Sequence, residues 1–186
     1  MALGDPYISV NDLKAHSNIT DVDDDLYLGA LVKAVSRGIE AFCGRQFNDA
    51  GTATARKFRP SSSQRVRVDD FHDVDGLVVA VDGQTRTDYE LEPLNGTRNG
   101  VPGWPYESLV FDTHVGNDVT VTARWGWAGV PADVKQAALI QAARIFGRRY
   151  STHGLVGQGD FVFRVSIRPD PDVSMMLAPY ALPRVA

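Results

Sequence analysis

The sequence has little of what usually marks a secreted protein, a membrane protein or an enzyme. Its single cysteine, Cys43, cannot form an intrachain disulfide, and core packing explains it because free cysteines are often buried. No run of about 18 apolar residues is present, so we expect no membrane-spanning helix. Met1–Pro6 has no basic region followed by an apolar stretch, so we expect no secretory signal and synthesis in a cytoplasm.

The sequence also lacks an excess of positive charge. The 186 residues include 19 Lys and Arg against 23 Asp and Glu, a formal net charge of -4. Tight DNA wrapping usually needs a basic face, so this balance gives no electrostatic basis for it. Hydrophobic residues make up 44% and charged residues 23%, as in ordinary globular proteins. The length allows one domain, or a domain with an insertion.

Common catalytic and ligand-binding signatures are absent. The four histidines are isolated, and HExxH, paired CxxC and Walker-type glycine motifs are missing. One acidic segment, Asp69–Gly76, combines four carboxylates with His72, and oxygen ligands of this kind could hold a hard cation. Its spacing is not that of a calcium loop, and a solvated turn between two strands is the simpler interpretation. We therefore predict no catalytic residue, no metal site and no cofactor.

The N-terminal half contains a strong helical pattern. Apolar residues recur at three- and four-residue spacing, which is typical of a packed helix over residues 21–43. They are Leu28, Leu31, Val32, Val35, Ile39 and Phe42. Thr20–Asp25 supplies capping groups and negative charge at its start, and Gly44 is the expected C-cap. A short helix over residues 9–16, capped by Ser9 or Asn11, precedes it.

Residues 53–125 change to strand patterns. Leu77–Val81 is a β-branched run that ends in Asp82-Gly83, which is a hairpin signal, and Tyr89–Leu91 is its predicted return strand. Leu109–Phe111 and Val119–Arg124 are predicted to form a further antiparallel pair. Trp104, beside the glycine-rich loop 95–103, either caps the core of the sheet or anchors an interface.

A long alanine-rich helix is predicted over residues 131–149, after the turn Trp125–Gly129. It is apolar around most of its surface, so it needs two neighbours, one of which could belong to another chain. Its basic end consists of Arg144, Arg148 and Arg149. These residues either complement the helix dipole or face DNA or another subunit.

The last segment, 151–186, has the pattern of an arm. Gly154–Gly159 is interpreted as a hinge, and Asp170 and Pro171 can start a short helix over residues 171–178. One face of this helix carries Val173, Met176, Leu177 and Tyr180. A helix this short is marginal alone and needs a docking surface.

These patterns together predict an α+β fold. Long N-terminal and C-terminal helices form a helical core, into which the antiparallel β region is inserted, with an extended C-terminal arm. The predicted division is a core over residues 1–150 and an arm over residues 151–186.

The whole order of segments resembles the head–tail connector, or adaptor, proteins of tailed phages, particularly those of phages that infect actinobacteria. The resemblance lies in the order and spacing of its segments. They are 39–47, the strand pattern 65–89, Trp104-Pro105, 119–127, 130–138, 148–151, 170–173 and 177–180.

This resemblance implies a structural virion protein with no catalytic residues. Such proteins form a ring, commonly a dodecamer, in the neck between the portal protein and a stopper or tail-completion protein, and double-stranded DNA passes through it without sequence-specific binding. The implied location is the virion neck, after synthesis in the host cytoplasm. The candidate interface residues are Trp104, Arg144, Arg148, Arg149, Val173, Met176, Leu177 and Tyr180.

Three alternatives stand beside this one. A tail-terminator or stopper protein of the neck would be dominated by β structure, which the helices at both ends of the sequence disfavour. A metal-dependent hydrolase would use His72 with Asp69, Asp70 and Asp73. A protein-binding module of the host is the third.

Overall fold

The computed structural model describes residues 3–149, 155–156, 163–164 and 170–183 of the chain. The chain forms two compact units, each assembled from separated segments. We call the first, Met1–Asp5 with Arg45–Val130, the sheet unit, and the second, Pro6–Gly44 with Pro131–Ala186, the helix unit.

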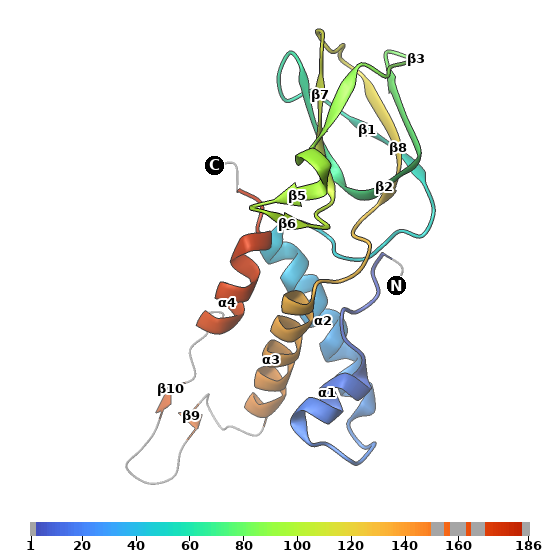
Figure 1. Ribbon diagram of the computed structural model, residues 1–186. Helices are drawn as coiled ribbons and strands as arrows, with labels where there is room; N and C mark the ends of the chain where they lie inside the picture. Colours follow the sequence, from blue (N-terminus) through green and yellow to red (C-terminus); the bar gives the residue numbers. More distant parts are fainter. Residues whose placement is uncertain (1–2, 150–154, 157–162, 165–169, 184–186) are drawn as a thin grey trace. The chain divides into compact units, whose positions relative to one another are not determined.

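The sheet unit contains a six-stranded antiparallel sheet (Figure 1). Its strand order is β1-β8-β2-β7-β4, and β3 pairs with β2. The strands are β1 (Thr54–Phe58), β2 (Arg65–Val81), β3 (Gln84–Thr85), β4 (Tyr89–Glu92), β7 (Tyr106–Phe111) and β8 (Val119–Trp125). A short 3-10 helix, η1 (Leu94–Gly96), is followed by a small two-stranded sheet of β5 (Thr97–Arg98) and β6 (Val101–Pro102).

Strand β2 is the longest strand, because it continues through the acidic segment. We expected a solvated turn at Asp69–Gly76, and this prediction is wrong, since β2 runs from Arg65 to Val81. Within the segment, the register of the pairing between β2 and β8 shifts twice. The shifts lie between Phe71 and Asp73 and between Asp73 and Val78. Two residues of the segment, Asp70 and Phe71, are buried, which a solvated turn would not allow.

Two predicted strand pairings are also corrected. The Asp82-Gly83 turn is present, but the strand that returns along β2 is β3 and not Tyr89–Leu91. Those residues lie in β4, which pairs with β7. Strands β7 and β8 do not pair with each other, because β2 lies between them and pairs with both.

The largest buried side chains lie mainly in this sheet. They form a hydrophobic cluster of residues from β2, β7, β8 and the loop before β8: Val66, Val68, Phe71, Val79, Val81, Leu109, Phe111, Val115, Val119, Val121, Ala123 and Trp125. The prediction of a helical core with long terminal helices and an inserted β region is therefore wrong. The alanine-rich helix buries Val134 and three alanines, and small side chains remove little apolar surface from water.

In the part of the chain that the structure describes, the helix unit contains four helices, of 8, 19, 17 and 7 residues. They are α1 (Val10–Ser17), α2 (Asp25–Cys43), α3 (Ala132–Arg148) and α4 (Pro171–Leu177), and α4 continues into the 3-10 helix η3 (Ala178–Tyr180). Helix α3 packs against α1, α2 and α4. Two short strands, β9 (Leu155–Val156) and β10 (Phe163–Arg164), pair with each other.

The ends of these helices follow from local chemistry. The Ser9 hydroxyl accepts from the Asp12 N–H at 3.0 Å, and the Asp12 carboxylate accepts from the Ser9 N–H at 2.8 Å, which is a capping box. Gly44 ends α2 in the left-handed conformation, and its N–H donates to Glu40 O. Asp170 caps α4 by accepting from the Asp172 N–H. Among the described residues, no helix is long and apolar enough to cross a membrane.

The predicted division into a core over residues 1–150 and an arm over residues 151–186 stays a prediction. Most of the predicted hinge, Gly154–Gly159, and most of the segment up to residue 169 lie outside the described residues.

Candidate functional site

An apolar groove runs between three helices of the helix unit. Its volume is about 320 Å³, and most of its lining is apolar. The lining residues are Ala34, Val35, Gly38, Ile39 and Phe42 of α2, Gln141, Ile145 and Arg148 of α3, and Val173, Ser174 and Leu177 of α4. A groove of this kind can accept an apolar side chain from a partner. We call it the α2–α3–α4 groove.

The groove has an open rim and one unsatisfied polar atom. Ala34 and Gly38 are both exposed, and a Cβ added at Gly38 would have no atom of the described residues within 4 Å, so these residues leave the groove open there. The Oε1 atom of Gln141 is buried and has no hydrogen-bond partner among the described residues. A buried acceptor without a donor costs free energy.

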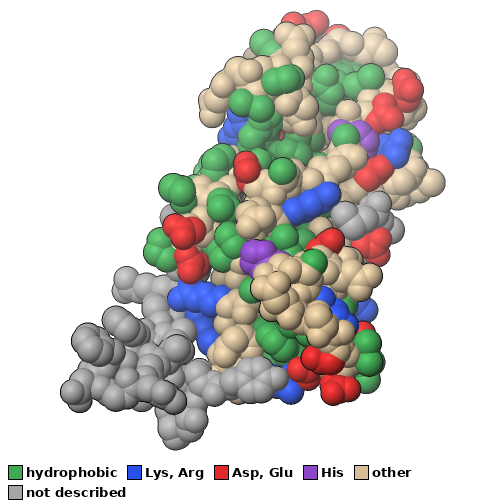
Figure 2. Space-filling model, turned by 60° about the horizontal axis from the view of Figure 1, so that its bottom comes forward, with side chains coloured by type: hydrophobic (Ala, Val, Ile, Leu, Met, Phe, Trp, Pro, Cys, Tyr) green, Lys and Arg blue, Asp and Glu red, His purple; other side chains and the backbone are tan. Residues whose placement is uncertain are grey.

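A second surface feature lies at the start of α2. The side chain of Leu26 is 93% exposed, and Val22, in the preceding loop, is 69% exposed. We call these two residues the apolar tip. Asp21 and Asp23 are exposed beside them, and Figure 2 shows hydrophobic and acidic side chains side by side at the lower right. Single exposed apolar residues are common, but a leucine this exposed beside a valine marks a candidate contact surface.

The predicted basic residues of α3 take up different positions. Arg149 contacts the Asp24 carboxylate at 2.5 Å and lies 5.2 Å from the ring centroid of Tyr27. Arg144 pairs with Asp170 at 2.7 Å, which ties α4 to α3. Arg148 lines the α2–α3–α4 groove. Only Arg148 of the three therefore contributes to this candidate site.

The predicted face of α4 is mostly turned to its own unit. Val173 and Leu177 are 4% and 2% exposed, and both line the groove. Met176 is half-buried. The Tyr180 hydroxyl donates to the Asp133 carboxylate at 3.2 Å, and burial, followed by the charge of Asp133, raises the pKa of Tyr180. Whether these residues also form an interface stays a prediction.

Trp104 lies in an aromatic cluster of the sheet unit. Its ring is 5.1 Å from that of Trp127, in an edge-on arrangement. Arg98 and Arg45 stack near its ring, with centroid distances of 5.1 and 6.0 Å. Such contacts hold the segment that carries Trp104. Its predicted interface role stays a prediction.

A buried ionic network lies beside this cluster. The Arg45 guanidinium donates to Glu107 at 2.8 Å and lies 3.4 Å from an Asp70 carboxylate oxygen, and its side chain is 2% exposed. Asp70 also accepts from the Trp127 indole N–H at 2.8 Å. Burial raises the pKa of Asp70 to about 6, although the positive charge of Arg45 opposes the shift. The ion pairs and the hydrogen bond from Trp127 offset the cost of burying the charged groups of Arg45 and Asp70.

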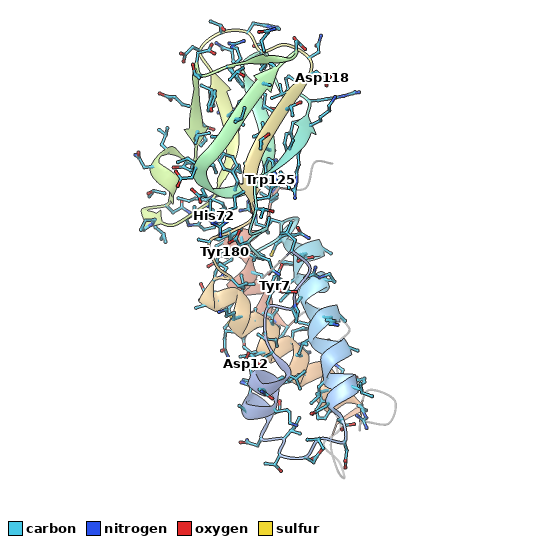
Figure 3. All side chains as sticks on the ribbon, turned by 90° about the vertical axis from the view of Figure 1, so that its right-hand side faces the viewer. Tyr7, Asp12, His72, Asp118, Trp125 and Tyr180 are labelled. Atoms are coloured by element: carbon cyan, nitrogen blue, oxygen red, sulfur yellow. The ribbon has the colours of Figure 1, made fainter. Side chains whose placement is uncertain are left out.

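The residues of the hydrolase alternative are engaged with other groups. Asp69 pairs with Arg56 at 2.6 Å, and Asp73 lies 3.6 Å from Arg124. His72 Nδ1 lies 3.1 Å from the Gly126 carbonyl oxygen, at the Trp125 end of β8 and away from Asp118 (Figure 3). In the part of the chain that the structure describes, no group of three His, Cys, Asp or Glu could hold a metal ion.

Two features of these surfaces were missed in the sequence. Val22 and Leu26 fall off the three- and four-residue spacing of the α2 core face, and that departure was the available signal. The pairing of Arg45 with Asp70 had no sequence signal, because the two residues are far apart in the chain.

Comparisons with known proteins give a fold similarity. No protein-family model and no curated protein matches the sequence. A solved chain described as the neck of an empty GTA particle, computed with C6 symmetry, is similar with a TM-score of 0.59 and 13% identity, over 97% of this chain and 92% of that chain. A chain of the virion of a native gene transfer agent particle is similar with a TM-score of 0.54, with the same identity and coverage. The chain therefore shares its fold, over nearly its full length, with structural components of gene transfer agent particles.

Proposed function

We propose that the protein is a structural component of the neck of a phage or a phage-like particle. The observation that carries this proposal is the fold similarity to a neck chain over 97% of this chain, at a TM-score of 0.59. Coverage of 92% of the other chain means that the match is not limited to one common motif. The sequence resemblance to head–tail connectors supports the same location.

The proposed role within the neck is that of an adaptor. The protein forms a ring that binds the portal protein on one side and a stopper or tail-completion protein on the other. Double-stranded DNA passes through without sequence-specific contacts, in line with the net charge of -4. The similar neck structure was computed with C6 symmetry, which is compatible with the dodecamer that the connector resemblance implies.

A second candidate role in the neck is that of a stopper or tail terminator. One observation favours it: a large hydrophobic cluster lies in an antiparallel sheet. The sequence argument against this role relied on helices at both ends of the chain, and the sheet core weakens that argument.

Electron microscopy of the assembled neck tests the proposal. The protein is mixed with purified portal rings, with and without the other neck proteins, and the complexes are imaged. For an adaptor we expect a ring of this protein directly on the portal when no other neck protein is present. Binding only after another ring protein has bound would favour the stopper role. Absence of the chain from purified particles, measured by mass spectrometry, would overturn both.

A further inference from the structure

The helix unit carries two surfaces that differ in shape. The apolar tip, Val22 and Leu26, projects from the start of α2, and the α2–α3–α4 groove is a depression that includes the second half of the same helix. At 3.6 residues per turn, Leu26 lies roughly 120–160° around α2 from the groove residues Gly38, Ile39 and Phe42. Because they point in different directions, the tip and the groove of one copy cannot both contact the same face of a neighbouring subunit.

The two surfaces are complementary in polarity and in charge. The tip offers two exposed aliphatic side chains, and the groove is lined by aliphatic and aromatic ones. Asp21 and Asp23 are exposed beside the tip, whereas the charged residue that lines the groove is Arg148.

We propose that the apolar tip of one copy inserts into the α2–α3–α4 groove of the next copy. Leu26 enters the groove beside Gly38, and the acidic residues next to the tip face Arg148. The occupant of the groove is thus a second copy of this chain. This inference deepens the proposed function, on which it rests, by naming the contact between neighbouring subunits.

The symmetry of this contact agrees with a ring. Because the tip and the groove are different surfaces, each copy uses its tip toward one neighbour and its groove toward the other. Such a head-to-tail contact generates a closed ring when the rotation per copy closes. A contact that pairs identical surfaces would stop at a dimer instead.

Disulfide trapping tests the contact in the full-length protein. In a Cys43→Ala background, chains with Leu26→Cys are mixed with chains with Gly38→Cys under mild oxidation, and the products are separated by mass. We expect mixed dimers to form at least about tenfold faster than in the control mixture, since the proposed contact holds these two thiols close together and so raises their effective concentration. The control replaces Leu26→Cys by Met175→Cys, because Met175 is 69% exposed on α4 and outside the groove.

A second pair of variants tests whether disrupting the contact reduces ring assembly. Leu26→Ser removes the tip, and Gly38→Trp fills the groove from a position with open space around its Cβ. We expect each to reduce incorporation into rings on the portal at least about tenfold. The matched controls are Met175→Ser and Gly147→Trp, since Gly147 is exposed and also has open space around its Cβ. Circular dichroism and thermal melting show whether each variant is folded.

Equal trapping rates for the Leu26–Gly38 and control mixtures would overturn the inference. So would protection of Gly38→Cys from a small maleimide at low protein concentration, because the groove would then be filled within one chain. Full ring incorporation of both folded loss variants would overturn it while leaving the neck function standing. Failure of the neck function would appear instead as unmodified protein that does not bind the portal.

Discussion

At the scale of single residues, Gly126 shows how a backbone contact restricts a side chain. It follows β8 with φ +98°, and a Cβ there would overlap the carbonyl oxygen of Asn48. We expect Gly126→Ala to lower the free energy of unfolding by roughly 2–4 kcal/mol, since both the conformation and the space are unavailable to alanine. Chemical denaturation measures the change.

Gly129 provides the control for this prediction. A Cβ at Gly129 would have no atom within 4 Å. Gly129→Ala should therefore change the free energy of unfolding by less than about 0.5 kcal/mol. Equal effects of the two substitutions would contradict the structural explanation.

The raised pKa of Asp70 predicts that the stability of the protein depends on pH. Its value of about 6 lies above the ordinary 3.8, so the folded protein binds a proton at Asp70 more readily than the unfolded chain does. The stability from this proton is fully present below about pH 3.8 and is lost as the pH rises through about 6. We expect the stability of the native protein, relative to Asp70→Asn, to fall by up to about 3 kcal/mol over this range.

Denaturation of both proteins at several pH values between about 4 and about 7 measures this difference, because this range begins near the pKa of the unfolded chain and ends above that of the folded protein. The difference should level off once Asp70 is ionised in the folded state. A difference that increases with pH would show that the Arg45 charge outweighs burial. Subtracting Asp70→Asn removes the contribution of other groups that titrate in the same range, such as the histidines.

The residue-scale features that could be predicted are local ones. Gly44 as the C-cap of α2 and Asp170 as the cap of α4 are confirmed, and of the two predicted caps of α1, Ser9 and Asn11, the structure has Ser9. Each depends on groups within a few residues of one another, so the sequence alone contains the relevant chemistry. The Arg45–Asp70 pair could not be predicted, because the fold brings its members together.

At the scale of elements, α4 is held by burial of its apolar side chains. Leu177 is 2% exposed and lines the groove together with residues of α2 and α3, and the Leu182 N–H, just beyond α4, donates to Cys43 O at 2.8 Å. We expect Leu177→Ala to lower the free energy of unfolding by roughly 2–4 kcal/mol, because it removes buried methyl groups and enlarges a groove. Chemical denaturation followed by far-UV circular dichroism measures the loss.

Met175 is the control on the same helix. Its side chain is 69% exposed, so Met175→Ala should leave the free energy of unfolding within about 0.5 kcal/mol of the native value. A loss at Met175 as large as that at Leu177 would mean that a different face of α4 is buried.

The pairing partners of the strands could not be predicted from the pattern of each strand alone. Alternation identified Val119–Arg124 as a strand, and the structure has β8 there. Alternation did not identify its neighbours, which are β1 and β2. A strand with a buried face can satisfy its hydrogen bonds with several partners, and contacts distant in sequence decide between them.

At the scale of the whole molecule, the chain makes two units, each from segments separated in sequence. The helix unit contains the apolar tip and the α2–α3–α4 groove, the two surfaces proposed to join neighbouring copies. The sheet unit contains the hydrophobic cluster of β2, β7 and β8 and the buried Arg45–Asp70–Glu107 network. The proposed ring contact and this hydrophobic cluster thus lie in different units, so substitutions at the tip or in the groove change no residue of the cluster.

The sequence by itself determined the local structure: the capping groups, the Asp82-Gly83 turn and several of the strands. These depend on neighbouring residues, whose interactions are present before the chain folds. Tertiary structure decided that the core is a sheet, that Asp69–Gly76 continues β2, that Asp70 is buried and that Leu26 is left exposed. The reason is that burial depends on which apolar faces meet, and large side chains from distant strands remove more surface from water than an alanine-rich helix does.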